Sequence, residues 1–161
     1  MQTSERGLQA IIAFEGMELN AYRCPAGVWT IGVGHTGEVD GVPVKKGLMI
    51  TQAKAMELLR DDLKKVEHCI NRQPFAERLT QGQFDALASF IFNVGMSAFQ
   101  ASTMRKRLCV GDYEAVAGEF KRWVYGTVNG KKETLPGLVK RRECECKMFI
   151  WSECKLCHFL Y

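Results

Sequence analysis

Glycines spaced through residues 21–44 constrain the fold of this 161-residue chain more than any other feature. They lie at positions 27, 32, 34, 37 and 41 and interrupt short runs that contain valine, tryptophan and isoleucine. Those apolar residues favour strands, and tight turns use the positive φ angles that glycine adopts freely. The segment is therefore predicted to form small antiparallel strands joined by tight turns. Helical patterns occupy the chain on both sides of it, so the expected fold class is α+β.

Two helices are predicted with clear ends before residue 80. Ser4 can cap a short helix that Gly16 terminates. Thr51 opens a long helix that stops before Pro74, and its narrow apolar stripe indicates one buried face. Some twenty helical residues would span roughly 30 Å, enough to bridge two lobes.

The rest of the chain is expected to be mainly helical. Thr80 and Gln83 form a capping-box pattern, and the segment after them is apolar nearly all round, which is typical of a central helix. Shorter helices are predicted over residues 102–109, 112–123 and 136–151. The glycine- and lysine-rich residues 126–135 are predicted to be an exposed loop.

The composition excludes several classes of protein. No apolar run reaches the roughly 18 residues of a membrane span, and the polar first nine residues hold no signal-peptide core. We therefore expect synthesis and folding in the cytoplasm, without a stable membrane anchor. The net charge of +4 suits an anionic partner. Nucleic-acid binding is not expected, because the basic residues form no long stripe with interleaved aromatic residues.

Seven cysteines raise the question of metal binding or disulfides. Their odd number leaves at least one thiol free in a monomer, and reduced thiols are the default in the cytoplasm. The C-terminal group consists of Cys144, Cys146, Cys154, Cys157 and His158. No metal site is expected there, because Cys144 and Cys146 would point to different sides of a helix. Zinc and a disulfide formed after export are the alternatives to free thiols.

Glu15 ends the apolar stripe of the first helix. Leu8, Ile11 and Ile12 form one helical face, and Glu15 follows at the next step of the same face. Apolar neighbours and the negative end of the helix dipole both disfavour an ionised carboxyl group. A carboxyl group that keeps its proton can act as a general acid. The alternative is a solvated glutamate in a last helical turn.

The residues around Glu15 resemble a known enzyme family. Glu15 is followed after eight residues by Cys24 and after five more by Thr30, and a glycine-rich TIGVGHT run covers residues 30–36. This pattern closely resembles the phage-type lysozymes, or endolysins, of glycoside hydrolase family 24, which have Asp or Cys at the second position. The resemblance covers about residues 5–145 and continues through Phe92-Asn93-Val94-Gly95 and Gly137-Leu138-Val139-Lys140-Arg141-Arg142.

This resemblance implies a fold and a reaction. The fold would be lysozyme-like, a single domain over residues 1–161. A β lobe at about 16–50 would meet a helical lobe at about 51–161, which includes the first helix, across a substrate cleft. The enzyme would be a muramidase that cleaves the β-1,4 bond between N-acetylmuramic acid and N-acetylglucosamine in peptidoglycan, with no cofactor.

The resemblance also assigns roles to single residues. Glu15 would protonate the leaving oxygen, and Thr30 would hold a water or a substrate group on the opposite face. Gly32 and Gly34 would let the backbone approach the sugar closely. Asn93 would line the cleft.

Cys24 departs from the family members that have Asp. A thiol with an ordinary pKa is mostly neutral at pH 7, so Cys24 acts as a thiolate only if a neighbour lowers its pKa. His35 and Arg23 are the neighbours nearest in sequence. Otherwise Cys24 only helps to place a water that Thr30 holds.

Other polar residues have more ordinary explanations. His35 is expected to be a structural partner more often than a substrate-binding residue, although both readings stand. Arg141 and Arg142 are predicted to lie on a solvated helix face with a structural pair, and a glycan or peptide-stem contact is the alternative. Glu18 is a conceivable second carboxylate, but an exposed position is favoured.

Two other classes of function remain open. A wall-binding module that has lost catalysis through Cys24 would bind peptidoglycan without cleaving it. A membrane-active cationic protein would kill without Glu15. As an endolysin, the chain is expected to be a monomer. It would reach the periplasm and cell wall only after a separate protein, such as a holin, has permeabilised the membrane.

Overall fold

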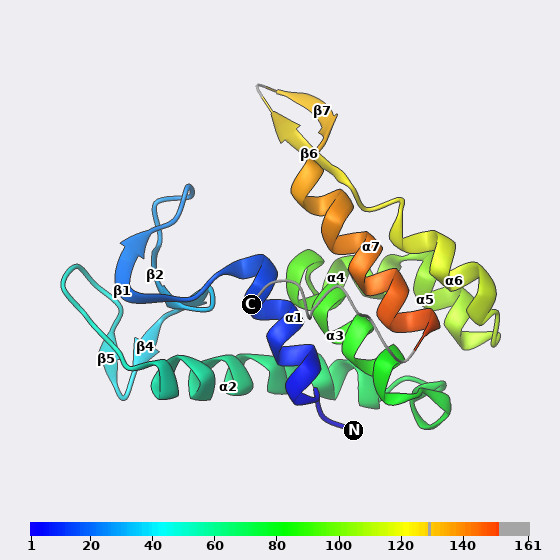
Figure 1. Ribbon diagram of the computed structural model, residues 1–161, viewed down its shortest axis with the longest axis horizontal. Coiled ribbons are helices and arrows are strands. Elements are labelled where there is room, and N and C mark those ends of the chain that lie inside the picture. The colour runs from blue at the N-terminus through cyan, green and yellow to red at the C-terminus, as the bar shows by residue number, and fades with distance from the viewer. Residues whose placement is uncertain (129, 152–161) are drawn as a thin grey trace.

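The computed structural model describes residues 1–128 and 130–151. Helices make up most of it, and three small antiparallel sheets complete it (Figure 1). The predicted α+β class is confirmed. In chain order the elements are α1 (Glu5–Glu15), β1 (Glu18–Arg23), β2 (Trp29–Gly32), β3 (His35–Thr36), β4 (Glu38–Val39), β5 (Val42–Pro43), α2 (Gln52–Asn71), a 3-10 turn (Ala76–Arg78), α3 (Gln81–Val94), α4 (Met96–Ala101), α5 (Thr103–Cys109), α6 (Tyr113–Phe120), β6 (Tyr125–Val128), β7 (Lys131–Thr134) and α7 (Pro136–Ile150).

The first two sheets lie together at one end of α2. Strands pair in the order β1-β2-β3, and β4 pairs with β5. Helices α3 to α7 gather toward the other end of α2, so this helix joins the two parts of the molecule (Figure 1). In the β1–β2 pair, Tyr22 lies opposite Thr30 and Arg23 lies opposite Trp29. This register places the last residues of β1 directly opposite the first residues of β2, next to the turn that joins the two strands.

Helices α1, α2 and α3 each begin with a side-chain cap at the predicted residue. The hydroxyl groups of Ser4 and Thr51 accept hydrogen bonds from backbone N–H groups in the first turns of α1 and α2. At α3, Thr80 and Gln83 form the complete capping box. Gly16 ends α1 with a φ of +78°, a backbone angle that residues with a side chain rarely adopt. At least one of the N–H groups that each helix leaves unpaired at its start is therefore satisfied by a side chain.

Helix α3 is the centre of the helical part, as its all-round apolar sequence predicts. Every residue from Phe84 to Ile91 is buried. The helix packs against α7, α1 and α2. A second, smaller core under the first sheets contains Ile31, Val39, Val44 and Leu58. Because Leu58 comes from α2, this helix contributes to both cores.

Residues 126–128 and 131–134 differ from the predicted loop. They belong to the antiparallel hairpin β6–β7, in which Tyr125 pairs with Thr134 and Val128 with Lys131. The hairpin projects from the start of α7 (Figure 1). A Cβ atom on Gly126 would collide with Cδ1 of Leu135, so a larger residue there would require the leucine side chain to shift. Helix α4 is also absent from the prediction, and α6 ends three residues earlier than expected.

Membrane and metal predictions can be compared only with the described residues. None of the described helices is long and apolar enough to cross a membrane. Within residues 1–128 and 130–151, no three His, Cys, Asp or Glu side chains are grouped to hold a metal ion. Cys144 is buried, and the thiol of Cys146 donates to the carbonyl oxygen of Ala117 at 3.3 Å. The other predicted members of the group, Cys154, Cys157 and His158, lie outside the described residues.

Candidate active site

Glu15 is the last residue of α1, and its carboxylate meets an arginine. Its Oε1 accepts a hydrogen bond of 2.5 Å from Nη1 of Arg141, and 26% of the side chain is exposed. The predicted environment of apolar neighbours is therefore wrong, because the nearest group is a cation. One face of Arg141 also lies over the ring of Phe14. The guanidinium fixes one carboxylate oxygen of Glu15, while Oε2 has no hydrogen-bond partner in the described part of the chain.

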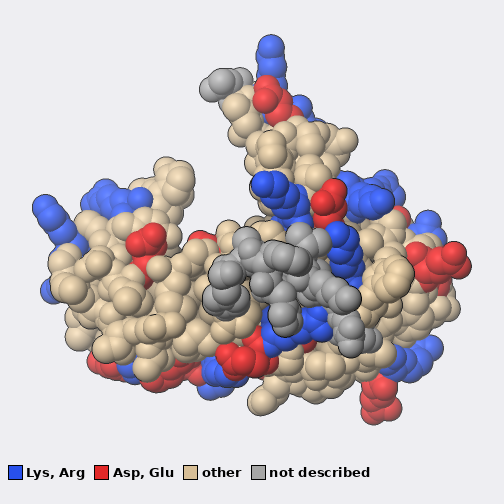
Figure 2. Space-filling view, viewed as in Figure 1, with Lys and Arg blue, Asp and Glu red and all other residues tan. Residues whose placement is uncertain are grey.

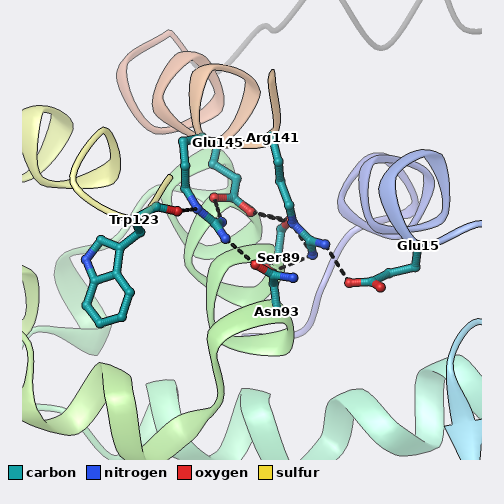
Figure 3. Close-up of polar contacts among 7 residues, drawn as sticks. Glu15, Ser89, Asn93, Trp123, Arg141 and Glu145 are labelled. Atoms are coloured by element: carbon teal, nitrogen blue, oxygen red, sulfur yellow. Dashed lines mark hydrogen bonds and ion pairs between the residues drawn. The ribbon is translucent and has the colours of Figure 1, made fainter. Parts of the chain in front are cut away.

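Arg141 is held from behind by buried polar groups (Figure 3). Its Nε donates to Oε1 of Glu145 at 3.1 Å, and its Nη2 donates to the carbonyl oxygen of Ser89 at 3.0 Å. Glu145 is fully buried, and its Oε1 also accepts from the hydroxyl group of Ser89 at 2.8 Å. These contacts come from α7 and α3, the two helices that form the interior of the helical part. The position of Glu15 is thus tied to the core.

Arg142 extends the same group of charges to Asn93. It donates to Oε2 of Glu145, to Oδ1 of Asn93 and, at 3.1 Å, to the carbonyl oxygen of Trp123. Arg141 and Arg142 are 3% and 1% exposed. The prediction of a solvated helix face is therefore wrong for both arginines, whereas the predicted structural pairing is present, with Glu145 as the shared partner. Burial raises the pKa of Glu145, while the two arginines act in the opposite direction.

The sequence contains a signal that would have revealed this group. In α7 the residues that follow one helical face are Leu138, Arg141, Arg142, Glu145, Met148 and Phe149. The spacing is that of a buried apolar stripe, but three of its central positions are charged. Charged side chains at buried positions need partners, so a mutual ion-pair group follows from the pattern.

Cys24 lies in the turn that connects β1 to β2. The turn is closed by hydrogen bonds from the Cys24 N–H to the carbonyl of Val28 at 3.0 Å and from the Gly27 N–H to the carbonyl of Cys24 at 2.7 Å. Hydrogen bonding from the backbone of Val28 lowers the pKa of the Cys24 thiol, against a smaller opposing effect of burial. The backbone of Ala26 also contributes to this lowering.

The groups that lower this pKa are not the two neighbours expected from the sequence. The guanidinium of Arg23 lies over the ring of Trp29, 5.1 Å from its centroid. His35 is bonded elsewhere. The turn backbone, rather than a nearby cation, is the main cause that favours the thiolate of Cys24.

Thr30 is buried on β2 and belongs to the same turn. Its hydroxyl group donates to the carbonyl oxygen of Val28 at 3.1 Å. A side-chain hydrogen bond from Thr30 also lowers the pKa of Cys24. Since a hydroxyl group has one proton, these two acceptors compete for it. Thr30 and Cys24 therefore form one polar unit.

Tyr22 connects this unit electrostatically with Glu15. Burial raises the pKa of Tyr22 most, and the negative charges of Cys24, Glu18 and Glu15 raise it further. Coulombic effects of this kind require proximity. The negative charges of Glu15 and Cys24 thus both reach Tyr22. Tyr22, an exposed residue of β1, is an addition that sequence reasoning missed.

The other predicted binding residues lie in structural positions. Gly32 has φ of +63° and is buried against Ala55 of α2, so it does not present its backbone to a ligand. Gly34 is exposed in a turn, with φ of +76°. Both ring nitrogens of His35 have protein partners, Oδ2 of Asp62 at 2.9 Å and the carbonyl oxygen of Glu38 at 3.1 Å. His35 therefore fastens the sheets to α2.

The surface above these residues is hollowed. Figure 2 shows the hollow between two projections, the β1–β2 sheet and the β6–β7 hairpin. Helix α1 ends, at Glu15, between these projections (Figures 1 and 3). A cavity of about 770 Å³ lies beside Asn93, with walls from α3, α4, α6, the hairpin and α7. Its polar wall includes Asn93, Glu119, Arg122, Lys132 and Arg142, but not Glu15.

Comparisons with known proteins agree with this arrangement. The family model for phage lysozyme matches residues 12–145. The endolysin of Acyrthosiphon pisum secondary endosymbiont phage 1 is 46% identical, over 92% of this chain and 98% of that relative. The structure of an endolysin from Escherichia coli O157:H7 phage FAHEc1 has a TM-score of 0.84 and 41% identity, covering 95% of this chain and 96% of that one.

A third similar structure is the muramidase domain of SpmX from Asticaccaulis excentricus. It has a TM-score of 0.81 and 35% identity, covering 92% of this chain and 97% of that one. The family model covers more than half of the chain, and the two structures align over nearly all of it. This chain, with Glu15 at the end of α1 and Cys24 in the β1–β2 turn, belongs to the phage lysozyme family.

Proposed function

We propose that the protein is a muramidase that hydrolyses the β-1,4 bond between N-acetylmuramic acid and N-acetylglucosamine in peptidoglycan. The observation that carries the proposal is the partly exposed carboxyl group of Glu15, which lies close enough to Tyr22 of β1 to add to the effect of burial in raising its pKa, as does Cys24 in the β1–β2 turn. Family membership supports it, since similar proteins are named endolysin and muramidase. As an endolysin, it would cause lysis of the host cell.

Glu15 is proposed to donate the proton to the leaving oxygen. The guanidinium of Arg141 contains only hydrogen-bond donors. Oε1 of Glu15, which it contacts, therefore acts as an acceptor and does not carry the carboxyl proton. The proton therefore belongs on Oε2, the oxygen that Arg141 does not fix. Departure of the sugar leaves positive charge on the muramic acid ring, and a water molecule adds at that carbon. Its hydroxyl group stays on the sugar, and its remaining proton passes to solvent, from which the Glu15 carboxylate regains a proton.

The Cys24–Thr30 turn is proposed to act on the opposite side of the sugar. A Cys24 thiolate, favoured by the turn backbone, places a negative charge near the developing positive charge. The hydroxyl group of Thr30 can hold the attacking water while its own proton is shared within the turn. No step in this scheme needs a cofactor.

Replacing Glu15 with glutamine tests the proposal. Glu15→Gln keeps the shape and an acceptor for Arg141 but has no acidic proton, so the hydrolysis rate should fall at least about 100-fold. The assay is mass analysis of fragments from purified sacculi. Newly reducing muramic acid ends support a muramidase. Anhydro ends would indicate a lytic transglycosylase, and free stem peptides would indicate an amidase.

The same assay separates the two rival functions. A wall-binding module would bind sacculi without releasing reducing ends. A membrane-active cationic protein would kill cells equally well as Glu15→Gln. Either result would contradict the proposed enzyme.

We further propose that the protein accumulates as a monomer in the host cytoplasm and reaches the wall after a holin has permeabilised the membrane. Some relatives, such as that of Escherichia phage Mu, are named SAR-endolysins. Expression without a permeabilising protein should leave cells intact, and chloroform should then lyse them at once. Spontaneous lysis without chloroform would contradict this route. Light scattering of the purified protein tests the monomer.

A further inference from the structure

The side-chain amide of Asn93 is oriented by a buried cation. Asn93 is exposed at the last turn of α3, where it lines the cavity beside α4 and the hairpin. Nη2 of Arg142 donates to its oxygen. A guanidinium accepts no hydrogen bond, so the amide atom facing Arg142 must be the oxygen. The NH2 group of Asn93 is therefore the end that remains for a ligand.

Arg142 in turn is oriented by Glu145. The carboxylate of Glu145 is 0% exposed and lies between the two arginines, with Oε1 facing Arg141 and Oε2 facing Arg142. Each arginine then donates a hydrogen bond from another nitrogen to a residue nearer the surface, Arg141 to Glu15 and Arg142 to Asn93 (Figure 3). One buried carboxylate thus orients two groups that face the solvent.

A contribution to the stability of the fold does not by itself explain why Arg141, Arg142 and Glu145 are buried. Buried ion pairs stabilise a fold little more than well-packed apolar side chains of similar volume, because desolvation opposes the attraction. The three charged residues occupy stripe positions of α7 that apolar residues fill in the next turn, at Met148 and Phe149. What the charges add is a fixed direction for the hydrogen bonds at their outer ends.

We propose that Glu145 is a positioning residue for this enzyme. Through Arg142 it fixes Asn93, so that the amide NH2 group of Asn93 binds an acceptor oxygen of the substrate in the cavity. Through Arg141 it fixes Glu15. This inference rests on the proposed muramidase function. The acceptor is a carbonyl or carboxylate oxygen, from an N-acetyl group of the glycan or from its peptide stem. Arg142 acts through Asn93 and Arg141 through Glu15, so the two branches affect different kinetic constants.

Three substitutions probe the Asn93 branch. Asn93→Asp keeps an oxygen for Arg142 but removes the donor, so KM should rise about tenfold, the effect of one hydrogen bond of ~1.4 kcal/mol. Arg142→Lys keeps the charge but cannot bond Glu145, Asn93 and Trp123 together, and should raise KM similarly. In both, kcat should stay within about twofold. Because they break one contact, the double variant should be no worse than the worse single variant.

Glu145→Gln should affect both branches. It is expected to raise KM and to lower kcat at least about tenfold, since Arg141 and Arg142 both lose a charged acceptor. Glu143→Gln is the matched control, because it makes the same chemical change at an exposed position of the same helix and should change neither constant. Thermal melts measure how much folded protein each assay contains. A merely structural network would lower the melting temperature and leave KM unchanged.

The assay uses soluble glycan strands with and without their peptide stems. If the KM effect of Asn93→Asp persists on stem-free strands, the acceptor oxygen belongs to the sugars; if it appears only with stems, it belongs to the peptide. Unchanged KM on both substrates, or additive effects of Asn93→Asp and Arg142→Lys, would overturn the inference. Wild-type protein that releases no reducing ends would instead refute the proposed function.

Discussion

At the residue scale, the backbone of a single turn sets the chemistry of Cys24. Hydrogen bonding from Val28 lowers the pKa of its thiol, so the thiolate forms at a lower pH than in an unfolded chain. Alkylation by iodoacetamide consumes the thiolate. We expect its rate at Cys24 to reach half of its plateau at a lower pH in the folded protein than in urea. Peptide mass spectrometry against pH measures both midpoints, and equal midpoints would contradict the role of the turn.

Substitution of Cys24 tests whether its negative charge matters for hydrolysis. Cys24→Asp should retain lysis, and activity should extend to lower pH, because a carboxyl group ionises near pH 4 while the thiolate is lost as pH falls through the lowered pKa of Cys24. Cys24→Ser is the control, since its hydroxyl group stays neutral throughout. It should lose at least about tenfold in rate. Equal rates of Cys24→Ser and wild type at pH 8 would mean that the turn only places water.

At the element scale, α1 approaches α3 so closely that Gly7 has no room for a side chain. A Cβ atom there would lie 2.7 Å from Cγ2 of Thr3 and 2.8 Å from Cγ of Asp85. Asp85 cannot move away easily, because its carboxylate accepts bonds from the Ser4 N–H and from Gln81, each at 2.9 Å. Gly7→Ala should therefore lower the free energy of unfolding by about 1–3 kcal/mol, although alanine favours a helix.

Gly118 provides the matched control in α6. It is exposed, and no atom lies within 4 Å of a Cβ placed there. Gly118→Ala should raise the free energy of unfolding by about 0.5–1 kcal/mol through helix propensity alone. Urea unfolding measures both variants. Stabilisation by Gly7→Ala would show that α1 and α3 are not in close contact.

Elements were predictable where local signals and burial agree. Helices α1, α2 and α3 have polar caps and apolar stripes, and all three begin where the sequence indicates. The hairpin β6–β7 was predicted only as a loop, since its strands are mostly exposed and lack apolar alternation. Its position depends on packing against Leu135, which local sequence does not encode.

The candidate site was predictable only in part for a similar reason. The spacing of Glu15, Cys24 and Thr30 identified the family, but their partners come from distant parts of the chain. Arg141 lies 126 residues after Glu15, and its contact depends on the packing of α7 against α3. Burial of Arg141 was missed because charged residues are usually solvated, and only the stripe position indicates otherwise.

At the scale of the whole molecule, one of the two projections that flank the hollow, the hairpin, carries two adjacent lysines. Lys131 and Lys132 lie on the hairpin side, and Lys132 lies over the ring of Tyr125, 4.5 Å from its centroid. Lys132 also lines the cavity beside Asn93. Peptide stems of the wall carry carboxylates, so we expect these lysines to attract the substrate to the hairpin side.

Removing both hairpin lysines tests this expectation. The double variant Lys131→Ala/Lys132→Ala should raise the half-saturating concentration of sacculi about three- to tenfold at low salt, and the difference should shrink at 0.5 M salt, where charges are screened beyond about 4 Å. Lys45→Ala/Lys46→Ala removes the same charge from two exposed lysines between β5 and α2. Because net charge changes equally, an equal loss in both variants would mean that overall charge, rather than the hairpin, attracts the wall. A loss confined to the hairpin variant, with kcat unchanged, is the result that places substrate contact on that side of the hollow.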